Sequence, residues 1–217
     1  MTQPVIVKIC GLSSPETLAA AIAAGADMAG FVFFEKSPRH IDLETARTLG
    51  LLARERISTV ALTVDADDAT LQDIVEALAP DYLQLHGKEA PARAAEIKAR
   101  FGLPVIKAAG VASAADVEAA RAYEGLADVI LFDAKPAPDA AVPGGAGVAF
   151  DWTLLRGVTA KHWMLSGGLN PENVTEAMRL TGARAVDVSS GVERERGVKD
   201  AAKIAAFVNS ARLSSGA

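Results

Sequence analysis

Short apolar runs alternate along this chain with segments of helical pattern, and this alternation constrains the fold more than any other feature. The runs read as strands and cover residues 5–10, 28–33, 58–64, 82–87, 104–110, 128–133, 162–168 and 183–191. Most are followed by an amphipathic segment with capping signals; the first of these segments opens with Ser14 and Pro15 and stops at Gly25. After the sixth run come a loop rich in Pro, Gly and Ala and a short helical turn at 151–157. Strands that alternate with helices predict a parallel sheet with right-handed crossovers.

Eight strand–helix units in 217 residues, with no linker between them, predict an α/β protein made of one domain, residues 1–217. The fold that fits this count is a single (βα)8 TIM barrel near the lower size limit of that fold. An open doubly wound sheet is the alternative. Its best marker, G-x-G-x-x-G after the first strand, is not matched by "CGLSSP", so we favour the barrel.

Composition limits the kinds of partner that we expect the protein to bind and the cell compartment in which we expect it to lie. The net charge is -5 and no Lys/Arg block occurs, so we expect no nucleic-acid partner. A single cysteine, Cys10, excludes an internal disulfide and a cysteine-rich zinc site. The start "MTQPVIVKIC" lacks the basic region and cleavage site of a signal peptide, and the apolar runs are too short to span a membrane. We therefore expect a cytoplasmic protein without membrane contact.

Polar residues gather at the ends of the expected strands, where a barrel builds its active site. Because side chains alternate along a strand, the pairs that share a face are Lys8 with Cys10, Gln84 with His86, Leu131 with Asp133, and Asp187 with Ser189. Unpaired charge inside a barrel is costly, so Lys8, Lys107, Asp133 and Asp187 should lie near the mouth or pair with one another. A lysine–aspartate network that only closes the barrel top is the structural alternative.

Cys10 ends the first strand. As a residue type it is most often a small buried hydrophobe. Its position favours chemistry, because Gly11 allows close approach and Lys8 on the same face can favour the thiolate. Asp133 ends the sixth strand across the mouth, and a base and an acid that face one another indicate proton transfer. No histidine is placed as the partner of a nucleophilic cysteine: we expect His40 and His162 to be solvated, and His86 is the only histidine at a strand end.

Two glycine-rich ends suggest a phosphate site. "SGG" ends the seventh strand and "SSG" the eighth, and the loops after these strands frequently bind phosphate in barrels. The residues that would present N–H groups or form a nest are Gly167, Gly168, Ser189, Ser190 and Gly191. Plain tight turns are the alternative. In "FFEKSPRHI", after the second strand, Arg39 offers a planar fork suited to a carboxylate.

These motifs together resemble the phosphoribosylanthranilate isomerase family of tryptophan biosynthesis. The resemblance runs through "KICGL", "GFVFFEKSPRHI", "LQLHG", "ILFDA", "GGAGVAFDW", "LSGGLNPENV" and "VDVSSGVE" to "GVKD", in order over nearly the whole chain. It implies a (βα)8 barrel and an Amadori rearrangement that uses no cofactor and no metal. It also implies Cys10 as general base, Asp133 as general acid, Arg39 on the anthranilate carboxylate, and the "SGG" glycines and "SSG" serines on the phosphate. Ser166 and Ala146 stand where many relatives would have Ala and Thr, and neither carries the chemistry.

The mechanism implied by the resemblance needs a protonated Asp133 to open the ribose ring and a Cys10 thiolate to remove the C2′ proton. Their pKa values must therefore be shifted in opposite directions. We expect Lys8, Gln84, His86 and Asp187 to contact the phosphosugar substrate, and the 134–147 loop, with Gly144, Gly145 and Gly147, to act as a lid. The chain would be a monomer or a homodimer.

Two other functions stay open at this point. A different barrel enzyme could form a Schiff base through Lys107, as aldolases do. A non-enzymatic sensor of a phosphate ligand would bind without turnover and would need no facing Cys and Asp.

Overall fold

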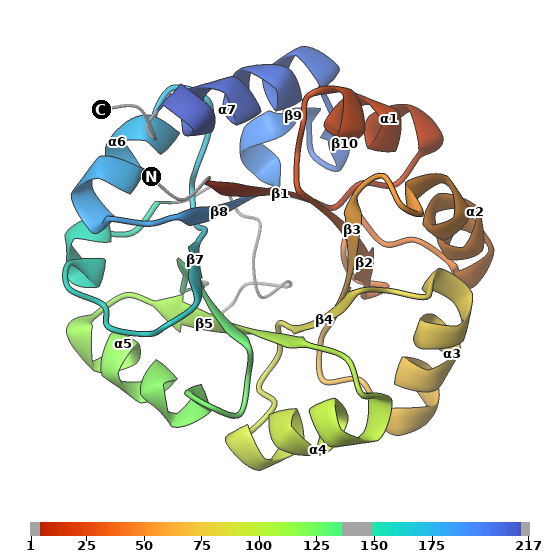
Figure 1. Ribbon diagram of the computed structural model, residues 1–217, viewed down its shortest axis with the longest axis horizontal. Coiled ribbons are helices and arrows are strands. Elements are labelled where there is room, and N and C mark those ends of the chain that lie inside the picture. Colours follow the sequence, from red (N-terminus) through yellow and green to blue (C-terminus); the bar gives the residue numbers. More distant parts are fainter. Residues whose placement is uncertain (1–4, 136–148, 214–217) are drawn as a thin grey trace.

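The computed structural model describes residues 5–135 and 149–213, and within them eight strands form a closed parallel barrel. Figure 1 looks along this barrel, with the strands around the centre and the helices outside. The strands are β1 (Ile6–Cys10), β2 (Met28–Phe33), β3 (Ser58–Thr63), β4 (Tyr82–Leu85), β5 (Val105–Val111), β6 (Val129–Ala134), β7 (Trp163–Leu165) and β8 (Ala185–Val188). β8 pairs with β1 and closes the barrel. The predicted (βα)8 architecture is confirmed.

The helices form the outer ring and follow the predicted segments. They are α1 (Pro15–Ala23), α2 (Leu43–Ala53), α3 (Asp68–Leu78), α4 (Pro91–Phe101), α5 (Ala114–Ala120), α6 (Val174–Thr181) and α7 (Ala201–Leu213), with 3-10 turns η1 (Arg121–Tyr123), η2 (Trp152–Leu155) and η3 (Ser190–Val192). The expected cap of α1 is present, because the Ser14 hydroxyl accepts a hydrogen bond from the Thr17 N–H and Pro15 is the first helical residue. Between β6 and β7 the described residues contain the 3-10 turn η2.

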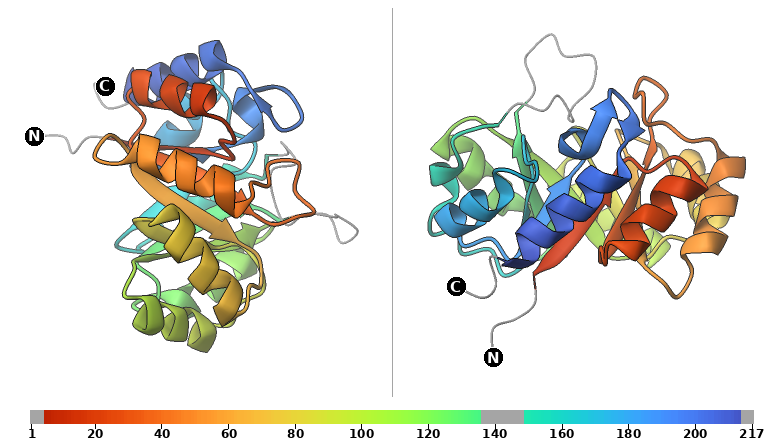
Figure 2. Two further views of the ribbon diagram at one scale, coloured as in Figure 1. Left: turned by 90° about the vertical axis from the view of Figure 1, so that its right-hand side faces the viewer. Right: turned by 90° about the horizontal axis from the view of Figure 1, so that it is seen from above.

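The last third of the chain differs from the expectation in detail. β7 ends at Leu165, not at 168, because Gly167 and Gly168 have φ angles of 84° and 69°, in the left-handed region that ends a strand. After η3 the chain forms a two-stranded antiparallel hairpin that the sequence patterns did not predict, β9 (Glu193–Glu195) and β10 (Val198–Lys199). In the right-hand view of Figure 2, this hairpin lies over one end of the barrel.

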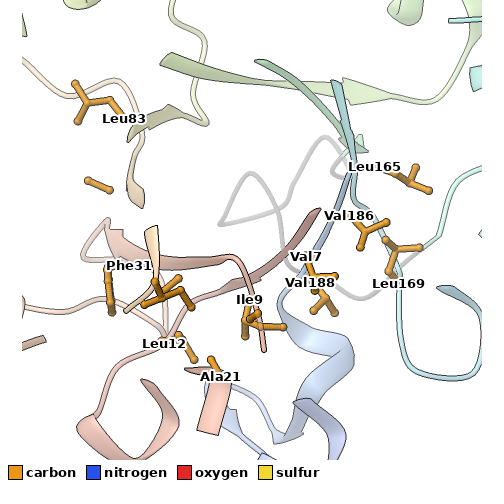
Figure 3. Close-up of a cluster of buried hydrophobic side chains, with 14 of the residues drawn as sticks. Val7, Ile9, Leu12, Ala21, Phe31, Leu83, Leu165, Leu169, Val186 and Val188 are labelled. Carbon is orange, nitrogen blue, oxygen red and sulfur yellow. The ribbon is translucent and has the colours of Figure 1, made fainter. Parts of the chain in front are cut away.

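Alternation along the strands sorts the buried side chains into two sets. One set packs between the barrel and the helices; Figure 3 shows part of it, including Val7, Ile9, Val186 and Val188. The other set fills the inside of the barrel, with Met28, Val60, Ile106, Leu131 and Met164 among its members. Polar residues of the inner face come later in the strands, so the barrel has an apolar floor and a polar mouth. No helix in the described part of the chain is long and apolar enough to cross a membrane.

Candidate active site

The inner face of β1 begins the site with an ion pair. Lys8 is fully buried, and its Nζ lies 2.7 Å from Oδ1 of Asp187 on β8, the strand next to β1. The other carboxylate oxygen of Asp187 accepts a hydrogen bond of 3.1 Å from the Ser166 hydroxyl, just after β7. The expected pairing of interior charges is therefore present. Ser166, which the sequence patterns set aside, is part of it.

Cys10 is the last residue of β1 and its side chain is buried, with a free thiol. It packs against Val32 and Leu62. This burial raises the pKa of the Cys10 thiol, and the charge of Lys8 opposes the effect without cancelling it. Lys8 thus favours the thiolate, as predicted, but the net pKa of the thiol is raised and not lowered as the implied mechanism requires. Desolvation by the apolar neighbours outweighs the ammonium.

Two glycines leave room around Cys10. A Cβ on Gly30 of β2 would lie 3.0 Å from the Cys10 Sγ and 3.1 Å from the Lys8 Nζ. Gly11 has a φ of 77°, and a Cβ there would lie 2.5 Å from Cδ of Arg39 and 3.2 Å from Oγ of Ser189. The glycine after Cys10 therefore allows Arg39 and Ser189 to converge beside β1. The importance of Gly30 was not predicted from the sequence.

A second chain of polar groups runs from β4 to β6. Nε2 of Gln84 lies 3.0 Å from Nδ1 of His86, and Nε2 of His86 lies 3.3 Å from Oδ2 of Asp133. If Gln84 donates to Nδ1, the His86 proton is on Nε2 and points at Asp133. The other oxygen of Asp133 accepts from the Ala134 N–H at 2.8 Å. The structure thus brings together the expected residues Gln84, His86 and Asp133, and it places Asp133 at the end of β6, as predicted.

Lys8 and Gln84 lie deeper than expected for groups that contact a substrate. Both have 0 % of their surface exposed. Their side chains hydrogen-bond to Asp187 and His86, respectively. In this conformation they would act on a substrate only through those neighbours.

Arg39 lies in the loop after β2 and is buried, with 5 % of its surface exposed. Its Nε and Nη2 donate to the two carboxylate oxygens of Glu193 on β9, at 2.7 and 2.9 Å. Glu193 also accepts at 2.8 Å from the buried ammonium of Lys199 on β10. The fork expected to bind a substrate carboxylate therefore holds Glu193 along one edge, and a substrate would have to meet the guanidinium elsewhere. Neither Glu193 nor Lys199 was predicted as a site residue.

The ends of β7 and β8 have the geometry of tight, glycine-dependent loops. A Cβ on Gly168 would lie 2.5 Å from the backbone of Ala149, and one on Gly191 would overlap the carbonyl oxygen of Leu169. Ser189, Ser190 and Gly191 are only half-buried. The N–H groups of Gly168 and Ser190 make no hydrogen bond to a main-chain carbonyl of the loops in the described part of the chain. Such N–H groups, together with the 3-10 turn that begins at Ser190, form the kind of backbone concavity that binds anions.

Lys107 lies on the outer side of β5. Its neighbours in sequence, Ile106 and Ala108, pack inside the barrel, so its own side chain points away from the interior. Its ammonium donates to Glu89 at 2.9 Å and to the carbonyl oxygens of Leu85 and Gly87. This ion pair is 3 % exposed on both sides. The alternative in which Lys107 forms a Schiff base in the mouth therefore has no geometric support.

Other expectations have mixed outcomes. His40 and His162 are exposed, as predicted. The proposed lid falls mostly on residues 136–148, which lie outside the described residues, as do Gly144, Gly145 and Gly147.

The pairing of Arg39 with Glu193 could not be predicted, because 154 positions separate them. The one available signal was that Glu193 and Lys199 belong to the motifs "VDVSSGVE" and "GVKD".

The fold is that of the (βα)8-barrel enzymes, a class whose active sites lie at the carboxyl ends of the strands. A model of the N-(5'-phosphoribosyl)anthranilate (PRA) isomerase family matches residues 7–210, which is most of the chain. The chain belongs to this family. The resemblance inferred from the motifs is thereby confirmed.

Relatives and solved structures agree with this assignment. The N-(5'-phosphoribosyl)anthranilate isomerase of Rhodopseudomonas palustris (strain HaA2) is 57 % identical over 97 % of both chains. That of Nitrobacter hamburgensis is 58 % identical over 95 % of this chain and 92 % of the relative. The crystal structure of the Thermotoga maritima phosphoribosyl anthranilate isomerase is 36 % identical, with a TM-score of 0.86 over 96 % of this chain and 99 % of that one. Another structure, 35 % identical with a TM-score of 0.84 over the same shares, is a complex with reduced 1-(o-carboxyphenylamino)-1-deoxyribulose 5-phosphate.

Proposed function

We propose that this protein isomerises N-(5-phosphoribosyl)anthranilate to 1-(2-carboxyphenylamino)-1-deoxyribulose 5-phosphate, an Amadori rearrangement in tryptophan biosynthesis. The observation that carries this proposal is the mouth itself. Cys10 ends β1 and Asp133 lies next to the end of β6, in one barrel whose seventh and eighth strands are followed by glycine-rich loops of a kind that can bind anions. Family membership supports the same substrate.

The chemistry divides between two side chains. Asp133, in its protonated form, donates its proton to the ring oxygen of the ribose while the C1′–O bond breaks, which gives a Schiff base with the anthranilate nitrogen. Cys10, as thiolate, then takes the C2′ proton, and the electron pair of that bond forms the enolamine. The enolamine tautomerises to the ketone. General acid and general base steps of this kind each contribute about a hundredfold or more to the rate.

His86 lies where it can orient the carboxyl group of Asp133. With its proton on Nε2, His86 would face Oδ2 of Asp133, which lies 3.3 Å away. Gln84, below it, fixes the ring through Nδ1. In this role Gln84 positions His86 and does not itself bind substrate.

Burial of Cys10 has a consequence for the base. A thiol whose pKa is raised is mostly protonated in the resting protein at neutral pH, but the thiolate that does form is a stronger base. Lys8 lies close enough to stabilise that thiolate, and Asp187 holds Lys8 in place. The active form of the protein is then the minority thiolate, whose population rises with pH.

Two groups of polar atoms at the mouth would bind the two anionic groups of the substrate. The phosphate would accept from the N–H groups of Gly168 and Ser190 and from the hydroxyl of Ser189. Gly167 and Gly191 allow these loops to pack closely against the backbone of Ala134 and Leu169. The anthranilate carboxylate would meet the guanidinium of Arg39. We propose a single cytoplasmic domain that acts as a monomer or homodimer without a nucleic-acid partner. The Thermotoga maritima relative is described as dimeric.

The test is to follow the fluorescence of the anthranilate group when freshly prepared N-(5-phosphoribosyl)anthranilate is added to the protein. We expect conversion at a rate proportional to protein concentration. Binding without conversion would leave the sensor alternative. Sodium borohydride should trap no adduct at Lys107, and a substrate-dependent adduct there would contradict the proposed chemistry.

A further inference from the structure

The β9–β10 hairpin carries two buried charged side chains to which the reaction above assigns no step. Lys199 is 3 % exposed and Glu193 is 7 % exposed. The ammonium of Lys199 makes three short contacts: 2.8 Å to Oε1 of Glu193, 2.9 Å to the carbonyl oxygen of Ser189 and 3.1 Å to the Ser189 hydroxyl. An ammonium has three protons, so all the donor capacity of Lys199 is used inside the protein.

Glu193 connects this ammonium to the loop after β2. Its carboxylate accepts two hydrogen bonds from Arg39, one from Lys199 and one from the Gly197 N–H at 3.0 Å. The hairpin is pressed onto that loop, since a Cβ on Gly197 would lie 2.8 Å from the carbonyl oxygen of Pro38. Arg39 and Ser189, the groups proposed for the two ends of the substrate, are thus joined by one continuous ionic network.

Lys199 brings a positive charge to the loop after β8, because its ammonium contacts both the carbonyl oxygen and the hydroxyl of Ser189. Glu193 is an anion that both Lys199 and Arg39 contact. The exposed Lys203 donates to the Glu193 carbonyl oxygen at 2.7 Å. Burial lowers the pKa of Lys199, and the charge of Glu193 opposes this effect without cancelling it.

We propose that Lys199 is a positioning residue for substrate binding, which holds Ser189 in the loop after β8 and places a positive charge beside the proposed phosphate site. Lys199 does not touch the substrate in this account. It acts through Ser189 and through its charge. The inference rests on the proposed placement of the phosphate at the ends of β7 and β8.

The decisive variant is Lys199→Met, which removes the charge and keeps most of the volume. We expect the KM for N-(5-phosphoribosyl)anthranilate and the Ki for inorganic phosphate both to rise about tenfold or more, as for the loss of a charge-assisted contact, while kcat changes little. A purely structural clamp would instead lower the melting temperature and leave the Ki for phosphate unchanged. Lys199→Arg, which keeps the charge, should recover part of the affinity for phosphate.

Lys107→Met is the matched control, because Lys107 is equally buried and ion-paired with Glu89 but faces away from the mouth. It should lower the melting temperature without changing the Ki for phosphate. If Lys199→Met does not fold, Lys199→Gln, which can still hydrogen-bond to Ser189, takes its place with the same expected rise in Ki.

The outcomes distinguish the role of Lys199 from the placement of the phosphate. Competitive inhibition of the unaltered protein by phosphate, with a higher Ki in the Lys199 variants, supports the inference. Competitive inhibition with the same Ki in Lys199→Met or Lys199→Gln overturns the inference alone. Absence of competition by phosphate in the unaltered protein would overturn both the placement of the phosphate and the role of Lys199.

Discussion

Lys8 and Asp187 form a buried ion pair across the junction of the first and last strands, with 2.7 Å between Nζ and Oδ1. Lys8 also lies beside Cys10, so the charge that can stabilise a Cys10 thiolate is itself held by a carboxylate. Asp187 has the opposite effect on Cys10, since its negative charge raises the pKa of the thiol. The balance between these two groups sets how easily the proposed base forms.

Ser166 offers a way to change that balance without touching the ion pair. Its hydroxyl donates to the second oxygen of Asp187 and so spreads the negative charge of the carboxylate. In Ser166→Ala the full charge of Asp187 acts on Lys8 and Cys10, and the pKa of the thiol rises further. We expect the ascending limb of the kcat/KM–pH profile to move to higher pH, with kcat on the plateau reduced by at most about tenfold, the lower end of what a lost hydrogen bond to a charged group costs. An unchanged profile would show that Ser166 does not affect the pKa of the Cys10 thiol.

Gly30 tests whether the space beside Cys10 matters. In Gly30→Ala the new methyl group would stand 3.0 Å from the sulfur and 3.1 Å from the Lys8 ammonium, so one of them must move. We expect kcat/KM to fall about tenfold or more, as for a displaced catalytic group, with the melting temperature lowered by only a few degrees. Unchanged kinetics would mean that neither Cys10 nor Lys8 has to occupy its observed position.

The sequence patterns predicted the barrel and the residues at its mouth for a physical reason. Strand periodicity decides which side chains share a face, so Lys8 with Cys10, and Asp187 with Ser189, followed from parity alone. Contacts between distant loops have no such rule. The pairing of Arg39 with Glu193 and the hairpin that carries Lys199 depend on tertiary packing after the last strand.

That the pKa of Cys10 is raised could not be predicted from the sequence, for a related reason. Lys8 is two residues away and visible in the sequence, whereas the desolvation comes from Val32 and Leu62 on other strands. The outward direction of Lys107, by contrast, was available from alternation. Its partner Glu89 lies in the loop after β4, where no sequence pattern identified it.

Arg39 contacts Glu193 and, in the proposed function, the carboxylate of the substrate. KM reports on the contact with the substrate, and the melting temperature reports on the contact with Glu193. Arg39→Ala removes the contact to the substrate carboxylate and should raise KM by the equivalent of ~1.5–3 kcal/mol, the cost of a charge-assisted hydrogen bond. It also leaves Glu193 without its guanidinium and should lower the melting temperature. A lower melting temperature with an unchanged KM would make Arg39 a structural partner of Glu193 only.

Glu193 makes stability depend on acid pH. Burial alone would raise the pKa of its carboxyl group, but the hydrogen bonds from Arg39 and the charge of Lys199 outweigh burial and lower that pKa from 4.5 to about 2. A lowered folded-state pKa stabilises the fold above the unfolded value, and this contribution is lost as the pH falls from about 4.5 towards about 2. The melting temperature should therefore fall more steeply across this window in the unaltered protein than in Glu193→Gln. Parallel curves for the two proteins would contradict the lowered pKa.

Cys10→Ser tests the central claim most directly, with kcat and melting temperature measured on the same preparation. A serine hydroxyl is close in size to the thiol but forms almost no anion at neutral pH, so a protein that needs Cys10 as base should lose nearly all turnover and keep its fold. Asp133→Asn is the companion variant, and because both groups serve one proton-transfer sequence, the double variant should be little worse than the poorer single one. If Cys10→Ser instead converts N-(5-phosphoribosyl)anthranilate at close to the unaltered rate, with only a modest loss of stability, Cys10 is a packing residue and the proposed mechanism is wrong.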